Sequence, residues 1–162
     1  MQNSNPNPNP ERAPDQDPAD GEGTRTDAWL RVGLAFLTAV QFGVGCWALL
    51  FPYSFFSVPW VGMGMAYNVH LMTDYGAMSL ATSVALGAGA VTMQRTVIRT
   101  GLASYLVFAT AHLAIHIGLV DHLPPGRRVP LLASLALAAV IPAVLLVLTG
   151  RTGRTAGTRA SG

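Results

Sequence analysis

The chain has 162 residues, of which 51% are hydrophobic and only 11% are charged. A soluble domain usually has about a quarter charged residues. Residues 1–27 contain six acidic residues and two arginines, a net charge of −4, and the rest of the chain contains eight arginines and two acidic residues, a net charge of +6. No basic stripe with interleaved aromatic residues is present, so a nucleic-acid-binding protein is excluded.

The cysteine and lysine content gives two further indications, one about redox chemistry and one about the type of organism. The single cysteine, Cys46, excludes an intramolecular disulfide and a CxxC redox pair. The chain has no lysine and is rich in Ala, Gly, Pro and Arg, a composition typical of a high-GC bacterium.

The two ends of the chain are predicted to be disordered cytoplasmic tails. Residues 1–27 consist largely of Asn, Pro, Asp and Gly without an apolar cluster, and such a segment cannot bury enough surface to offset the entropy of ordering it. It also lacks the basic start and short apolar stretch of a secretory signal. Residues 151–162 are predicted to form a second, basic tail.

Four apolar segments lie between the tails, in a bundle region that spans residues 28–150. They cover about residues 29–51, 69–93, 101–120 and 129–148, each long enough as a helix to cross a hydrocarbon core of about 30 Å. Backbone groups in lipid must be paired within the segment, so these segments are predicted to be helices. The fold class is therefore an all-α integral membrane four-helix bundle.

Particular residues mark the ends and bends of these helices. Pro52 is expected to end the first helix and Asn68 to cap the second. Pro142 is expected to kink the fourth helix, and Gly150 to close it. The second segment is rich in small residues, which allow helices to approach closely in lipid, so it is expected to be central in the bundle.

The arginines predict the orientation in the cell membrane. Eight of them flank one side of the expected bundle, namely Arg12, Arg25, Arg31, Arg95, Arg99, Arg151, Arg154 and Arg159. Only Arg127 and Arg128 flank the other side, so both termini are predicted to be cytoplasmic. The uncharged loop 52–67 on the outer side holds five aromatic residues, which favour either the membrane interface or a lid on the bundle.

The ionisable residues at membrane depth are the candidate site. They are His70, Asp74, His112, His116, Asp121 and His122. A four-residue spacing places His70 with Asp74, and His112 with His116, on one helical face each. Antiparallel second and third helices would bring Asp74 within hydrogen-bond or one-water reach of His112 or His116 near the outer end, with Gly76 allowing the two backbones to approach.

Several interpretations of this cluster stay open. It is a structural hydrogen-bonded network, or His70, Asp74, His112 and His116 bind zinc, iron or copper. A haem held by His70 and either of the other two, a quinone, or a transport pathway in a homodimer are further alternatives. No Ser/His/Asp set, phosphate-binding glycine loop or CxxC is present, so the pattern identifies neither a catalytic residue nor a substrate.

The segment 67–81 also carries a family resemblance. Its His-x3-Asp-x-Gly-Ala pattern, the preceding Phe51-Pro52 and the later His112 and His116 resemble small four-helix bacterial membrane proteins of the DoxX-like families. The resemblance covers about residues 29–148. It implies a subunit of a redox or quinone-linked membrane assembly, whose partners are the lipid bilayer and another membrane protein or a second copy. A self-contained metal- or haem-binding membrane enzyme is the alternative, and a small homodimeric transporter the third.

Overall fold

A computed structural model describes residues 18–159, with side chains described for residues 25–150. All regular secondary structure in this part of the chain is helical. The elements are α1 (Pro18–Leu50), α2 (Pro52–Phe56), α3 (Pro59–Gly62), α4 (Val69–Thr92), α5 (Arg95–Leu119), the 3-10 helix η1 (Val120–His122) and α6 (Pro125–Arg159). Three helical stretches are long and apolar enough to cross a membrane, namely Arg25–Leu50, Arg95–His122 and Pro125–Gly150.

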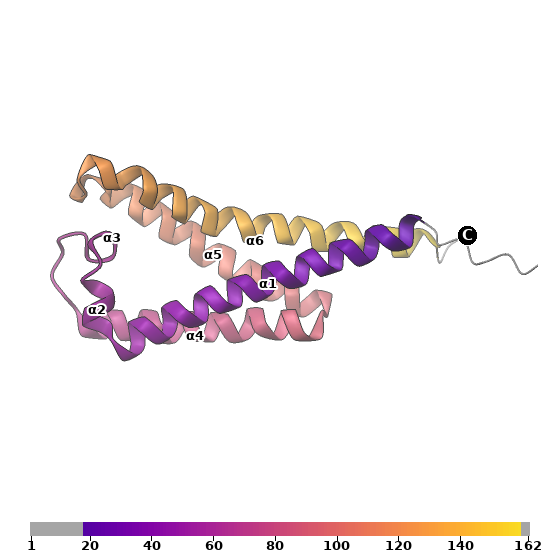
Figure 1. Cartoon of the computed structure of the whole chain (residues 1–162), viewed down its shortest axis with the longest axis horizontal. Helices are drawn as coiled ribbons and strands as arrows, with labels where there is room; N and C mark the ends of the chain where they lie inside the picture. Colours follow the sequence, from indigo (N-terminus) through magenta and orange to yellow (C-terminus); the bar gives the residue numbers. More distant parts are fainter. Residues whose placement is uncertain (1–17, 160–162) are drawn as a thin grey trace, which may run out of the picture.

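The four long helices pack in a cyclic order. Helix α1 contacts α4, α4 contacts α5, α5 contacts α6, and α6 contacts α1. The start of α1 lies at the same end of the molecule as the end of α6, here named the terminal end (Figure 1). The short helices α2 and α3 lie at the opposite end with the α5–α6 connection, and this is named the loop end (Figure 1).

Two of the predicted helix boundaries are confirmed. Helix α1 ends at Leu50, and Pro52, which has no backbone N–H to continue it, starts α2 instead. The Asn68 side chain accepts a hydrogen bond from the Leu71 N–H at 3.2 Å, which satisfies one of the free donors at the start of α4.

Other boundaries differ from those predicted. Helix α5 begins at Arg95, so the two arginines expected in the connecting loop lie in its first turns. Helix α6 begins with Pro125 and continues through Gly150, which was expected to end it; a glycine inside a helix costs only about 1 kcal/mol and need not stop it. Helix also covers residues 18–27 and 151–159, where tails were expected; residues 1–17 and 160–162 lie outside the described part.

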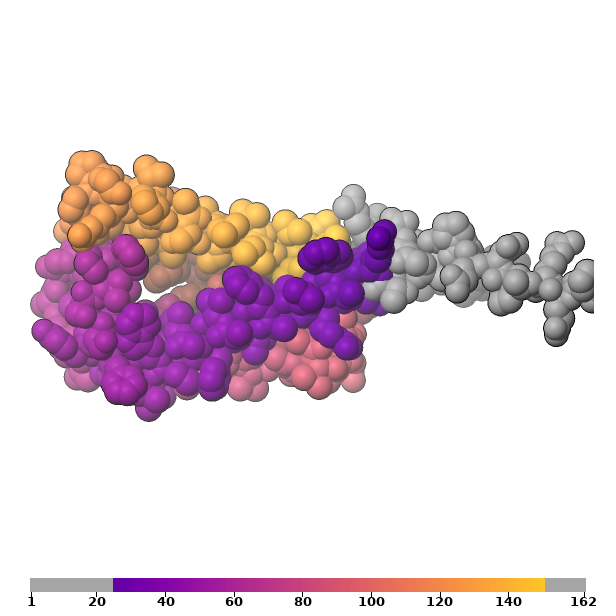
Figure 2. Space-filling model, viewed as in Figure 1, coloured from indigo at the N-terminus to yellow at the C-terminus, as the bar shows by residue number. Residues whose placement is uncertain are grey.

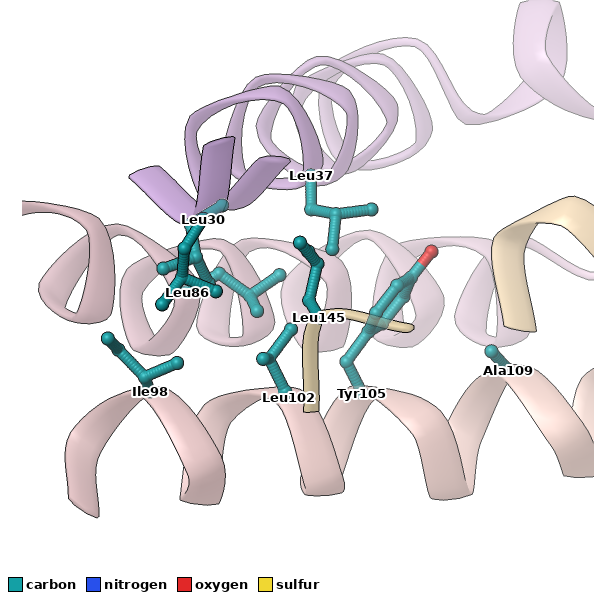
Figure 3. Packing of buried hydrophobic residues seen from close by; sticks show 9 residues of the cluster. Leu30, Leu37, Leu86, Ile98, Leu102, Tyr105, Ala109 and Leu145 are labelled. Atoms are coloured by element: carbon teal, nitrogen blue, oxygen red, sulfur yellow. The ribbon is translucent and has the colours of Figure 1, made fainter. Parts of the chain in front are cut away.

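Buried leucines from all four long helices form the main core. Leu37, Leu86, Leu102 and Leu145 come from α1, α4, α5 and α6 and lie together between the helices (Figure 3). Helices in lipid gain little from hydrophobic burial, so close side-chain contact is the main attraction that this core provides. Pro142, inside α6, is fully buried, and the preceding residue, Ile141, packs against this core.

Glycines set the closest helix contact, which joins α1 to α4. A Cβ atom added to Gly76 would lie 2.6 Å from the backbone nitrogen of Leu49, and one added to Gly45 would lie 3.0 Å from the Gly76 carbonyl oxygen. Gly76 was expected to face the third predicted helix, which is α5, but it packs against α1. The contact between α4 and α5 uses different glycines, Gly89 against Ile98 and Gly101 against the Ala85 carbonyl.

The aromatic loop covers part of the loop end. Phe55 is buried in a cluster with Ala48 and Met72, whereas Tyr53 and Trp60 are exposed. Met63, after α3, packs with buried leucines of the α5–α6 connection and α6, which links the loop to the far side of the bundle. Figure 2 shows these segments meeting at the loop end, with the surface hollowed between the C-terminal part of α1 and the N-terminal half of α6. The buried Phe55 and Met63 fit the interpretation of the loop as a lid on the bundle. The exposed Tyr53 and Trp60 fit the interpretation that it lies at the membrane interface.

Candidate functional site

The His70–Asp74 pair lies on the outward surface of α4. His70 and Asp74 are separated by one helical turn, and His70 Nε2 lies 3.3 Å from Asp74 Oδ2. Their side chains are 83% and 65% exposed, respectively. Within the described side chains, Asp74 makes no hydrogen bond to His112 or His116; its recorded polar contact is His70. The pair therefore stands apart from the other two histidines.

The His112–His116 pair is half-buried on α5, where rings from three elements pack together. We name Phe55, Tyr75, Phe108, His112 and His116 the ring cluster. The ring of His112 stacks on Phe108 with centroids 5.2 Å apart and on Tyr75 of α4 with centroids 6.1 Å apart. Tyr75 in turn stacks on Phe55 of α2 at 5.8 Å. The edge of His116 meets His112 at 4.6 Å, so the two imidazoles are in direct contact.

The polar atoms of this histidine pair lack protein partners. The Nδ1 atom of His116 is buried and makes no hydrogen bond. The hydrogen bonds of the described side chains also include none to His112. Buried polar atoms in proteins are nearly always hydrogen-bonded, and an exception calls for an explanation, such as a water or a bound group. The ring cluster thus combines flat apolar faces with free imidazole nitrogens.

The remaining two candidates, Asp121 and His122, lie in the connection between α5 and α6. Asp121 Oδ1 lies 2.9 Å from Arg128 Nη1, and Arg128 Nε donates a hydrogen bond to the Leu123 carbonyl at 2.9 Å. The Nδ1 atom of His122 lies 3.0 Å from the Leu119 carbonyl oxygen. Asp121 and His122 are exposed, and these contacts join the end of α5 to the start of α6. Their geometry is that of a turn stabilised by local bonds.

The six candidates therefore occupy three separate places. Among the described side chains, no group of three or more His, Cys, Asp or Glu residues is arranged to hold a metal ion. The set His70, Asp74, His112 and His116 is accordingly not assembled into one site. A haem between His70 and either histidine of α5 would also need His70 to turn from the outward surface of α4 toward the interior.

The structure adds four residues that the sequence interpretation did not select. Gln41, in the middle of α1, is 6% exposed, and its side-chain amide interacts with the Tyr105 hydroxyl on α5. Tyr75 and Phe108 complete the packing around His112. The sequence did contain a sign of the Gln41–Tyr105 contact. Gln41 is an amide in an otherwise apolar segment, and such residues tend to bond across helices.

Over residues 18–159 the regular secondary structure is helical and includes three helices of membrane-spanning length and hydropathy, which places the protein in the class of helical membrane proteins. Comparison with protein-family models, with curated proteins and with solved structures finds no match to this chain.

Proposed function

We propose that the chain is a multi-pass protein of the cell membrane with four crossings, namely the three apolar helical stretches described above and helix α4. Helix α4 has 24 residues, about 36 Å of helix at 1.5 Å per residue, and it packs along α1. Helix α1 begins and helix α6 ends at the terminal end (Figure 1). A chain that starts and finishes on one side of the membrane must cross it an even number of times. The arginine distribution favours a cytoplasmic terminal end, and hence an outer loop end.

We further propose that the ring cluster binds the head group of a quinone, as in a DoxX-like subunit of a redox-linked membrane assembly. The observation that carries this proposal is the buried, unpaired Nδ1 atom of His116 beside the stacked rings of His112, Tyr75 and Phe108. A quinone ring is flat and apolar on its faces, and its carbonyl oxygens accept hydrogen bonds from an imidazole N–H. Its apolar tail would remain among the helices or in lipid, and a partner protein would supply the electrons.

The test is a binding titration of the purified protein in lipid nanodiscs with a short-chain ubiquinone. Trp47 is a suitable reporter because its ring lies 5.4 Å from that of Phe55, and a bound quinone should quench its fluorescence. His116→Ala should weaken binding by about five- to tenfold, the loss of one net hydrogen bond. His122→Ala is the matched control, because this histidine is exposed, bonds to the Leu119 carbonyl outside the ring cluster, and should leave binding unchanged when replaced.

Two outcomes would contradict the proposal. One is the absence of saturable quenching, and the other is equal binding by the parent, His112→Ala and His116→Ala. An absorption spectrum and a metal assay of the same preparation distinguish the other interpretations. A Soret band or a stoichiometric metal that is lost in His116→Ala would support a haem or metal site instead.

A further inference from the structure

Two buried side-chain atoms of the described residues lack a hydrogen bond to the protein, and they lie on neighbouring helices. One is Nδ1 of His116 on α5, and the other is Oγ of Ser79 on α4, a residue that is only 1% exposed. The packing of Gly101 against the Ala85 carbonyl sets the register of these antiparallel helices and places Ser79 about level with Phe108. Phe108 lies about 12 Å farther from the loop end than His116. A quinone ring at His116 therefore leaves Ser79 without a partner.

Three other polar side chains lie around Ser79. The Tyr75 hydroxyl interacts with Ser79, although without hydrogen-bond geometry, and it interacts electrostatically with the Tyr105 hydroxyl on α5. Tyr105 in turn interacts with the Gln41 amide on α1, and Figure 3 shows its hydroxyl directed from α5 into the space between the helices. We name these four residues the polar cluster. A buried water molecule needs two to four polar partners, and the polar cluster offers them around an atom that has none.

The polar cluster is continuous with the ring cluster on one side only. Tyr75 belongs to both, because its ring stacks on that of His112. Toward the terminal end, Tyr105 packs in the core of buried leucines. The other buried serine and threonine of residues 25–150, Ser83 and Thr149, each donate a hydrogen bond to a carbonyl of their own helix. Polar groups that lack partners therefore extend from the loop-end half of the bundle to this core and stop there.

The helices leave room on the side of the loop end. Helices α1 and α4 pack as one pair and α5 and α6 as another, and the two pairs diverge toward the loop end (Figure 1). The contact of Gly33 on α1 with Leu145 on α6 lies in the other half, whereas the surface is hollowed between the loop-end halves of the same two helices (Figure 2). Gln41 lies about 14 Å from the end of α1 at Leu50, close to half of a hydrocarbon core of about 30 Å. The polar cluster thus lies near the middle of the membrane, at the inner limit of the wider half.

We propose that the polar cluster and the pair His112 and His116 line a half-channel for water, which opens at the loop end and is closed in the middle of the membrane by the leucine core. Water bonded to Ser79 Oγ and His116 Nδ1 gives both atoms the partner that they lack. The half-channel suits water and protons and not metal cations, because none of the buried side chains in the described part is charged. A group bound at the ring cluster then exchanges protons with the solution at the loop end only. The half-channel requires the four proposed crossings but not quinone binding.

The accessibility of an introduced thiol tests the half-channel. In a Cys46→Ala background, which removes the only cysteine, Ser79→Cys replaces the hydroxyl with a thiol. Right-side-out and inverted membrane vesicles are treated with Ag⁺ in chloride-free buffer, denatured, and alkylated with a maleimide that shifts the band on a gel. Ag⁺ enters narrow aqueous paths but not lipid, and a thiol that has bound it escapes alkylation. Ser57→Cys, at an exposed position of the loop, marks the loop-end side. Ag⁺ should protect Ser79→Cys in the vesicles in which it protects Ser57→Cys, and not in the other preparation.

Two matched control variants lie on the same helix. Ala81→Cys is at an exposed position on the outer surface of α4, two residues from Ser79, and Leu86→Cys is in the leucine core. A thiol in apolar surroundings stays protonated, and the thiolate is the form that binds a metal ion. Both controls should therefore react at least about tenfold more slowly than Ser79→Cys. Circular dichroism should show the helix content of the parent in all four variants.

Protection of Ser79→Cys as slow as that of Leu86→Cys from both sides would overturn the half-channel. Protection from the side opposite to Ser57→Cys, or equally from both sides, would overturn its closure by the leucine core. If Ser57→Cys and Ser79→Cys are both protected only from the cytoplasmic side, the half-channel is supported and the proposed orientation is contradicted. No quinone is added, so a failed quinone titration leaves this result unchanged.

Discussion

The glycine contact between α1 and α4 makes a quantitative prediction for Gly76→Ala. The added Cβ would lie 2.6 Å from the backbone nitrogen and 2.9 Å from the Cβ of Leu49. Ordinary contacts between such atoms are about 3.5–4.0 Å, so the two helices must separate by about 1 Å. The atoms met are backbone or Cβ atoms, which cannot rotate away as the end of a flexible side chain can.

The expected cost follows from two opposing effects. Overpacking of a close contact costs about 1–3 kcal/mol, and replacement of a helical glycine by alanine returns about 1 kcal/mol. Gly43→Ala is the matched control, because Gly43 lies on α1 near the same contact with no atom within 4 Å of its added Cβ. The control gains the same helix propensity, so Gly76→Ala should be less stable than Gly43→Ala by about 1–3 kcal/mol, the packing cost alone.

Reversible unfolding in mixed detergent micelles, followed by far-UV circular dichroism, measures this difference. The two variants should have the same helix content before unfolding and differ in the midpoint of the transition. Equal midpoints for Gly76→Ala and Gly43→Ala would refute the reasoning, because the close approach of α1 and α4 would then have no energetic consequence.

Two further predictions concern the helix start and the topology. Asn68→Ala should destabilise the protein by about 1 kcal/mol in the same unfolding assay, because the Leu71 N–H loses its side-chain acceptor; Asn68→Asp, which keeps an acceptor, should not. A phosphatase reporter that is active only outside the cytoplasm should stay silent when fused after Gly162 and become active when fused within loop 52–67. An active fusion after Gly162 would overturn the proposed orientation.

The elements of this fold are predictable because their signals are local. Apolar length predicts helices where the backbone has no water to bond to, Pro52 separates α1 from α2, and Asn68 caps α4. The start of α5 and the end of α6 are not marked in this way. Helix continues there through Arg95 and Gly150, residues that tolerate a helix as well as they tolerate a loop.

The candidate site was only partly predictable from the sequence. The spacing of His112 and His116 correctly places both rings on one face of their helix, and the structure brings them into contact. The other rings of the cluster come from α2 and α4, and their packing on His112 depends on how separate helices meet. Likewise, Gln41 meets Tyr105 only because α1 and α5 both face the core.

The sequence by itself determined the helical class of the chain, the positions of its apolar segments and which residues share a helical face. The tertiary structure decided which way each face points. Gly76 packs against α1, and because residues two apart in a helix lie on nearly opposite sides, Asp74 must then face away from the bundle. Tyr75 between them turns to His112. The rotation of a helix about its own axis is set by contacts with its neighbours. It therefore cannot be predicted from the spacing of residues along one segment.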